Sequence, residues 1–339
     1  MNFVAAATSA VERIPLPDSL TRAGIAMLVE RSSRRLRVDP AIERAFAAEM
    51  ATLPIALHPD DANTQHYELP PEFFALILGP RRKYSCCLYD GVENLAAAEE
   101  RALAETAAHA GLADGQLVLE LGCGWGSLTL WMAERFPRST IVAVSNSRPQ
   151  RTYIEAEAAR RGLNNVRVLT ADMNAFEADR QFDRVVSVEM FEHMSNWPAL
   201  LMRVHSWLDP RGLLFLHVFS HRTTPYRFDT EDKADWIAQH FFTGGVMPSH
   251  GLIRELDVPF TVEADWRWNG MHYRRTAEDW LRNYDAQADA IVGILREVYG
   301  SAAPLWARRW RLFFLATAEL FGAREGTEWG ISHYALRPR

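Results

Sequence analysis

The sequence predicts an α/β protein built on a doubly wound, mainly parallel sheet, with a helical segment before it and an aromatic-rich cap inserted after it. Strand-like and helix-like segments alternate from Leu117 to Val218, which is typical of a parallel sheet covered by helices on both faces. A glycine-rich turn follows the first strand, and ligands bind at the carboxyl ends of such strands. The expected parts are a helical N-terminal segment that closes over the ligand (1–92), a ligand-binding core (93–221), and a substrate cap that also completes the core sheet (222–339).

Composition limits the classes of function. The chain has 339 residues, and its 48% hydrophobic content suffices for a sizeable core. A net charge of −6 and a pI near 6.0 argue against nucleic acid as the main partner. The sequence contains no run of 18 apolar residues, so we expect no membrane span. Its first residues lack the basic region of a signal peptide, so we expect none. The three cysteines form no metal-ligand spacing, so we expect no metal, reduced thiols and a cytoplasmic protein.

The first part of the chain reads as helices joined by loops. Apolar spacing predicts helices over 20–36 and 40–50, and the first has an arginine-rich face that favours either solvent or anionic lipid. Pro70 and Pro71 begin a short helix that ends before Gly79. The loops around this helix carry three hydroxyl side chains that either close over a ligand or serve loop packing: Tyr67, Tyr84 and Ser85.

The core elements follow in alternation. A helix at 95–110 leads into the sheet. We expect strands at 117–121, 140–145, 166–170, 182–188 and 212–218, with helices at 127–136, 149–161 and 197–207. The stretch from about 222 to 300 is rich in aromatic residues, which indicates either a cap over a substrate or a helical cover that only completes the core.

The turn after the first strand combines a carboxylate with three glycines: Glu120, Gly122, Gly124 and Gly126. Glycines allow positive φ and a close approach of the backbone to a ligand. In a pyrophosphate-binding GxGxxG turn the third glycine comes one residue later, and the Glu120 carboxylate would repel a phosphate but attract an ammonium group. The pattern resembles the E/DxGxGxG signature of class I S-adenosylmethionine (SAM) methyltransferases, which implies a Rossmann-like fold. The alternative is a glycine-rich turn of another α/β protein.

Residues after the next two strands fit the same ligand. Many class I methyltransferases place an acidic residue after the second strand to hold the ribose hydroxyls, and here the neutral Asn146 and Gln150 are expected to replace it. Asp172 and Met173 follow the third strand, where the adenine would lie. The alternative for Asp172 is a turn residue that caps the next segment.

Two carboxylates and an imidazole follow the fourth strand. Glu189, Glu192 and His193 stand at i, i+3 and i+4, so they share one face if the segment is helical. A group of this kind can accept and donate protons near neutral pH. The alternative is a structural hydrogen-bond network behind the strand.

Longer motifs identify a superfamily. The segments HYELPPEFF, KYSCC, LELGCGWGSLTL, SNSRPQ, FDRVVSVEMFEHM and EWGISHYAL resemble the cyclopropane fatty acid synthase and coclaurine N-methyltransferase superfamily over nearly the whole chain. EMFEHM and GTEWGISH are most similar to the coclaurine N-methyltransferase branch. That resemblance implies catalysis by Glu189, Glu192 and His193 and an aromatic amine pocket at Trp310 and Phe313, to which Trp268 is added.

One position resembles the other branch. Cyclopropane synthases hold a bicarbonate ion as the base, and the matching residues are Cys86, Glu192, His217 and Tyr273. The N-methyltransferases keep most of these positions but not the histidine at 217. Phe219 replaces the isoleucine of the synthase pattern, which narrows that pocket.

The sequence therefore predicts a SAM-dependent methyltransferase (EC 2.1.1) that releases S-adenosylhomocysteine. The expected acceptor is a small molecule, with an amine nitrogen as the first choice. The alternatives are methylene transfer to unsaturated phospholipid with bicarbonate, methylation of a thiol, and a SAM-binding protein without activity. Peripheral lipid contact and a homodimer are both compatible with the sequence, which fixes neither the acceptor nor the oligomeric state.

Overall fold

A seven-stranded sheet forms the centre of the protein. The structure is a computed structural model that describes residues 12, 16–57, 69–228, 231 and 235–339. The strand order is β3-β2-β1-β4-β5-β9-β8; β1 to β5 run parallel, and β9 lies antiparallel between β5 and β8. These strands are β1 (Leu117–Leu121), β2 (Thr140–Ser145), β3 (Val166–Thr170), β4 (Phe182–Val188), β5 (Leu208–His221), β8 (Phe260–Asn269) and β9 (Trp329–Pro338).

The expected doubly wound sheet is confirmed. β1 and β2 are almost wholly buried because strands covered on both faces read as continuous apolar runs. The expected bounds of β1 to β4 match, whereas β5 begins four residues earlier and ends three later than the expected 212–218. The antiparallel edge of β9 and β8 does not follow from the alternating pattern, since both strands lie beyond it.

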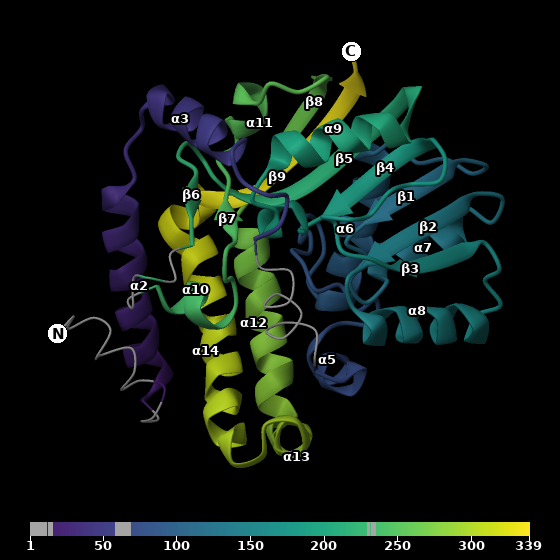
Figure 1. Cartoon of the computed structure of the whole chain (residues 1–339). Coiled ribbons are helices and arrows are strands. Elements are labelled where there is room, and N and C mark those ends of the chain that lie inside the picture. The colour runs from purple at the N-terminus through teal and green to yellow at the C-terminus, as the bar shows by residue number, and fades with distance from the viewer. Residues whose placement is uncertain (1–11, 13–15, 58–68, 229–230, 232–234) are drawn as a thin grey trace.

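Helices cover both faces of the sheet. The first face packs against α6, α7 and α8, and the other against α9 and α3 (Figure 1). The helices of the first two thirds are α2 (Asp18–Arg35), α3 (Pro40–Met50), α5 (Pro71–Ile77), α6 (Leu95–His109), α7 (Ser127–Arg135), α8 (Arg148–Arg160), the 3₁₀ turn η1 (Phe191–His193) and α9 (Trp197–Trp207). A small ribbon of β6 (Tyr226–Arg227) and β7 (Val246–Met247) follows, with the short helices α10 (Trp236–His240) and α11 (Leu252–Glu255).

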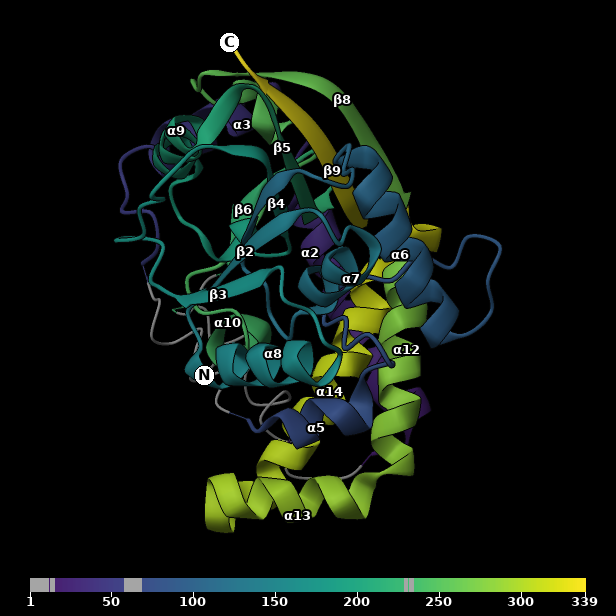
Figure 2. The ribbon, with the colours of Figure 1, turned by 90° about the vertical axis from the view of Figure 1, so that its right-hand side faces the viewer.

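The C-terminal helices form a second layer beside the sheet. Helices α12 and α14 pack along one another, α2 lies along α14, and α13 crosses their far end (Figures 1 and 2). Phe74 of α5 contacts both Trp125 in the glycine turn and Trp310 of α14, so one aromatic core joins this layer to the carboxyl end of the sheet. The remaining elements are α12 (Met271–Ala286), α13 (Ala288–Tyr299), η2 (Gly300–Ala302), α14 (Ala303–Gly322) and η3 (Ala323–Gly326).

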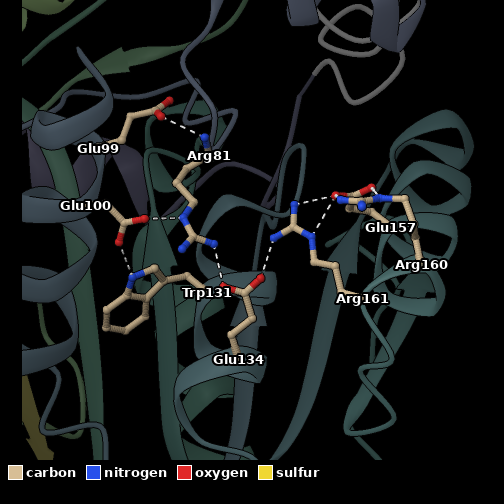
Figure 3. A network of polar contacts seen from close by, with 8 residues as sticks. All are labelled: Arg81, Glu99, Glu100, Trp131, Glu134, Glu157, Arg160 and Arg161. Atoms are coloured by element: carbon tan, nitrogen blue, oxygen red, sulfur yellow. Dashed lines mark hydrogen bonds and ion pairs between the residues drawn. The ribbon is translucent and has the colours of Figure 1, made fainter. Parts of the chain in front are cut away.

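The loop between α5 and α6 is held by a polar network (Figure 3). Arg81 in this loop pairs with Glu100 of α6 and with Glu134 of α7. Glu99 of α6 is fully buried and accepts backbone hydrogen bonds from Arg81 (2.8 Å) and Lys83 (3.1 Å). The network continues to α8 through Arg161, Glu157 and Arg160. It therefore fixes the loop against the helices of the sheet.

In the described part of the chain, no helix has the length and apolar character to cross a membrane.

Candidate active site

A cavity opens at the carboxyl ends of β1 to β4. Its walls come from the turns after these strands and from the loop between α5 and α6. The expected cofactor residues in the wall are Tyr84, Ser85, Glu120, Gly122, Gly124, Asn146, Gln150, Asp172 and Met173. Glu189 and His193, expected on the catalytic side, line the same cavity. The topology therefore brings together residues from four separate turns, as the sequence predicts for a doubly wound sheet.

The three glycines of the turn have different roles. All have positive φ, +80° at Gly122, +51° at Gly124 and +77° at Gly126. A Cβ at Gly122 would lie 2.5 Å from the Met190 side chain, and one at Gly126 would lie 2.7 Å from Ile154. A Cβ at Gly124 would meet no protein atom within 4 Å. Gly122 and Gly126 therefore permit close packing, while Gly124, which lines the cavity, leaves room for a ligand.

Glu120 is a buried carboxylate without a cationic partner among the described residues. It is 3% exposed, and its Oε2 accepts a hydrogen bond from the Thr129 hydroxyl at 2.5 Å. Burial raises the pKa of Glu120 to about 8, with the Thr129 hydrogen bond opposing the rise. A ligand that brings an ammonium group would compensate this carboxylate.

Other polar groups in the cavity wall also lack hydrogen-bond partners among the described residues. Trp125 Nε1, Ser127 Oγ and Gln150 Nε2 are buried, line the cavity and have no hydrogen-bond partner within the described ranges. Gln150 Oε1 accepts from Ser145 Oγ at 2.6 Å, which turns its amide nitrogen outward as a donor. Asp172 accepts the Asn174 amide at 2.8 Å, so it caps a turn as well as lining the cavity. Buried unpaired donors are rare in native proteins, and they indicate a polar ligand here.

Two donors and an imidazole nitrogen contact the carboxylate of Glu189. The Cys86 amide donates to Oε1 at 2.9 Å, His217 Nε2 lies 3.1 Å from the same oxygen, and the Tyr273 hydroxyl donates to Oε2 at 2.8 Å. Glu189 has φ +49°, which costs a non-glycine residue roughly 1–2 kcal/mol. This strained backbone aims a buried carboxylate at the cavity. Burial raises its pKa, while nearby Lys83 and the donors oppose the rise.

The neighbouring residues of this motif do not share a helix face with Glu189. The shared face required a helical segment, and this condition is not met, because the backbone of Glu189 is left-handed and a 3₁₀ turn covers Phe191–His193. Glu192 Oε1 accepts the Phe219 amide at 2.6 Å, and the side chain is fully buried outside the cavity wall. Burial and the nearby Glu189 raise the pKa of Glu192 well above its usual range. His193 lines the cavity and stacks on Phe242, with ring centroids 4.8 Å apart.

Lys83 is a site residue that the sequence analysis missed. It is 2% exposed, lines the cavity, and its ammonium donates to Ser85 Oγ (2.5 Å) and to the Cys86 carbonyl (2.7 Å). Its charge favours the ionised form of Glu189. Its position gave a clue, because Lys83 follows two arginines and directly precedes a loop that is mostly buried in the structure. From the sequence alone, however, three consecutive basic residues are interpreted more simply as a solvated surface.

Several expected site residues lie elsewhere. Tyr67 is outside the described residues. Gly126 is the N-cap of α7 and packs against Ile154, outside the cavity wall. Trp310 and Phe313 are buried in the aromatic core, where Phe313 stacks on Phe241 at 4.5 Å, and Trp268 packs against His217 and His333. These last three are not among the residues that line the described cavity.

Comparison with known proteins assigns the chain to a family. The model of the mycolic acid cyclopropane synthetase family matches residues 58–327. (S)-coclaurine N-methyltransferase of Thalictrum flavum subsp. glaucum is 34% identical over 84% of this chain and 81% of its own length. Cyclopropane-fatty-acyl-phospholipid synthase of Escherichia coli K12 is 29% identical over 79% of this chain and 66% of its own length. The crystal structure of coclaurine N-methyltransferase with N-methylheliamine and S-adenosylhomocysteine superposes with a TM-score of 0.91, at 32% identity over 95% of this chain and 96% of that one.

The chain belongs to this methyltransferase family. It is a SAM-dependent methyltransferase of the class I fold, and its resemblance to the coclaurine N-methyltransferase branch is confirmed. The cavity suits SAM, because Glu120 offers a carboxylate to the α-ammonium group and Gly124 leaves space beside the turn. SAM supplies a methyl group on a positively charged sulfur, which needs no further activation.

The same residues do not suit a bicarbonate ion. Of the four expected bicarbonate residues, His217, Tyr273 and the Cys86 amide contact the Glu189 carboxylate. Cys86 Sγ donates to the Cys87 carbonyl at 3.3 Å, and Glu192 accepts the Phe219 amide. A carboxylate of the chain thus takes the polar contacts that an external anion would use.

The pKa of Glu120 predicts pH-dependent binding of S-adenosylhomocysteine. At pH 7 the free protein holds a proton on Glu120, since its pKa is about 8, and the incoming ammonium group must displace it. Affinity should therefore rise as the pH increases from 6 to 8, by at most about tenfold per pH unit. Calorimetry in buffers of different ionisation enthalpy should detect release of one proton per ligand bound at pH 6.5. The Glu120→Gln variant should bind more weakly and lose the pH dependence; wild-type affinity that is constant over this range would contradict the assignment.

Proposed function

We propose that the enzyme transfers the methyl group of SAM to an amine nitrogen of a small molecule, with Glu189 as the proton acceptor. The arrangement that carries this proposal is the carboxylate of Glu189, held by the Cys86 amide, His217 and Tyr273 at the cavity wall. A carboxylate built into the chain removes the need for an external base. The name of the relative (S)-coclaurine N-methyltransferase states a methyl transfer to nitrogen, which agrees with this choice.

Proton balance explains why an amine needs this group. An alkylamine is mainly protonated at pH 7, and only its neutral form has the lone pair that attacks the methyl carbon. Glu189 takes the proton from the ammonium ion; the nitrogen–carbon bond then forms as the sulfur–carbon bond breaks, with the electron pair left on sulfur. The product is again an ammonium ion, so each turnover leaves one proton on the enzyme.

The neighbouring groups divide the remaining tasks in this proposal. We assign the proton of the pair to Glu192, because burial and the nearby Glu189 raise its pKa well above the usual range, and we assign the ionised form to Glu189. His193 presents its ring to the cavity from its stack on Phe242, and we assign it to orientation of the acceptor. The aromatic pocket expected of Trp268, Trp310 and Phe313 stays a prediction.

The N-terminal part has a role in the same proposal. Lys83, Tyr84 and Ser85 belong to the wall of the cavity, which supports residues 1–92 as a segment that encloses the cofactor. The C-terminal part, residues 222–339, would then supply the substrate side through Tyr273 and the aromatic core. Enclosure excludes water from the reacting atoms.

The test offers two acceptor classes in parallel. Release of S-adenosylhomocysteine is measured with a panel of arylalkyl amines and with vesicles of unsaturated phospholipid, each with and without added bicarbonate. We expect turnover on amines at a rate that bicarbonate does not change. Turnover on vesicles that rises with bicarbonate would move the enzyme to the cyclopropane branch. A small thiol in a third arm tests S-methylation, and no turnover in any arm alongside tight binding of S-adenosylhomocysteine would support a non-catalytic protein.

A further inference from the structure

Three histidines form a continuous hydrogen-bonded chain from Glu189 toward the surface. His217 Nε2 lies 3.1 Å from Glu189 Oε1, and His217 Nδ1 lies 2.8 Å from His333 Nε2. His333 Nδ1 lies 2.8 Å from His109 Nδ1, and His109 Nε2 lies 3.2 Å from Glu105 Oε1. Both nitrogens of every ring therefore have a partner within the chain. The site already described accounts for Glu189 and His217 only.

The fold positions each ring of this chain. His217 of β5 and His333 of β9 are register partners in the antiparallel pair, so their side chains lie next to each other on one face of the sheet. His109 is the last residue of α6, and Glu105 lies one turn before it. Trp266 stacks on His109 at 3.7 Å, and Trp268 packs 4.3 Å from His333. These two tryptophans restrict the rings and shield them from water.

Burial of the side chains decreases from His217, beside the cavity, to Glu105 at the outer end of the histidine chain. The side chains of His217 and His333 are inaccessible to solvent. The side chain of His109 is 11% exposed, and that of Glu105 is 29% exposed. The chain thus links the buried base to a carboxylate that exchanges protons with water.

We propose that His217, His333 and His109 relay protons between Glu189 and Glu105, an inference that rests on the proposed amine methyltransferase function. Each turnover leaves one proton on Glu189, which faces the cavity that the reactants would occupy. The relay offers that proton an exit that does not depend on release of the product.

The transfer balances atom by atom. Glu189 gives its proton to His217 Nε2, His217 gives the proton on Nδ1 to His333 Nε2, and His333 gives the proton on Nδ1 to His109 Nδ1. His109 then gives the proton on Nε2 to Glu105 or to water. Four bonds to hydrogen form, four break, and every ring ends neutral with its proton on the opposite nitrogen.

The environment of the three histidines favours transfer of a proton along them over retention of the proton on an inner ring. Burial lowers the pKa of His217 and His333 well below the usual range, and the nearby Lys83 lowers both further. Burial also lowers the pKa of His109, but the Glu105 carboxylate opposes that effect. A proton is therefore least stable on the inner rings and more stable at the outer end, beside Glu105. Glu189, Cys86, Tyr273 and Glu192 are the other titratable groups around the inner end.

The decisive variant is His109→Gln. A glutamine amide can donate and accept hydrogen bonds, so it would preserve any structural role of the His109 side chain. It cannot transfer protons from one partner to the next. We expect kcat on the best amine to fall roughly tenfold in weak buffer, less than loss of the base itself would cause. The KM for the amine and the affinity for S-adenosylhomocysteine should stay unchanged. A solvent deuterium isotope effect on kcat should appear, because proton exit becomes rate-limiting.

A second variant and a control complete the experiment. His109→Ala opens the outer end, and added imidazole should restore most of its kcat in a concentration-dependent way. His205→Gln is the matched control, because His205 also lies in the last turn of a helix and packs edge-on against an aromatic ring, Phe260, outside the relay; it should behave like wild type. Wild-type kcat in His109→Gln, without an isotope effect and without imidazole rescue in His109→Ala, would overturn the relay.

One measurement is independent of turnover. In protein labelled with ¹⁵N-histidine, couplings across the N–H···N hydrogen bonds should link His217 to His333 and His333 to His109. Their absence would overturn the relay whatever the activity. Failure of wild type to methylate any amine would instead overturn the proposed function, so the two failures are distinguishable.

Discussion

Replacing Glu189 by glutamine is expected to lower kcat for amine methylation by about 10²–10⁴-fold. The amide has the shape of the carboxylate and can still accept from the Cys86 amide and contact Tyr273, so the fold should persist. It cannot take a proton from the ammonium form of the acceptor. Affinity for S-adenosylhomocysteine should change little, because we expect Glu120, and not Glu189, to bind its ammonium group. Stopped-flow or steady-state assays of S-adenosylhomocysteine release, with calorimetry for binding, measure both quantities.

Raising the pH gives this prediction a second readout. If Glu189 serves as the base, the residual rate of Glu189→Gln should recover as the pH approaches the pKa of the amine, since the neutral acceptor then arrives from solution. Glu328→Gln is the matched control: Glu328 is also a buried carboxylate, and His221 Nε2 lies 3.1 Å from it. It lies outside the cavity wall, so the control should lose stability but keep kcat. Equal losses of kcat in both variants would indicate a general effect of removing a buried charge.

Local patterns in the sequence were sufficient to predict the core of the fold. The apolar runs of β1 to β4 and the glycines after β1 are signals that act over a few residues, so the strand bounds and the location of the turn at the cavity follow from the amino-acid sequence. The antiparallel strands β8 and β9 are different, because β9 pairs with β5 from more than a hundred residues away. The residues within β8 and β9 do not by themselves predict which strands these segments pair with.

The chemistry of the site depended on tertiary contacts for the same reason. Cys86 and Tyr273 reach Glu189 from 103 and 84 residues away. The sequence placed them near a bicarbonate ion by resemblance, and only the positive φ of Glu189 brings a carboxylate of the chain to them. The same residue breaks the helical geometry that a shared face of Glu189, Glu192 and His193 would have required. The histidine chain likewise depends on the register of His217 and His333, which a single sequence does not specify.

Replacing Gly124 by valine is expected to weaken binding of S-adenosylhomocysteine by about a hundredfold or more, equivalent to roughly 2.7 kcal/mol. A Cβ at this position meets no protein atom within 4 Å, and the residue lines the cavity. The valine methyl groups would therefore occupy space that the bound ligand uses. Calorimetric titration measures the loss, and turnover at fixed SAM concentration should fall with it.

Backbone strain alone does not explain that loss, and Gly162→Val separates the two effects. Gly162 has φ +69°, and a Cβ at this position would also meet no protein atom within 4 Å, but the residue follows α8 outside the cavity. Both variants carry a side chain in the left-handed region, which costs roughly 1–3 kcal/mol of folding stability. Their melting temperatures should therefore fall together, whereas only Gly124→Val should lose ligand affinity. Matching affinities in the two variants would show that the turn at Gly124 does not approach the ligand.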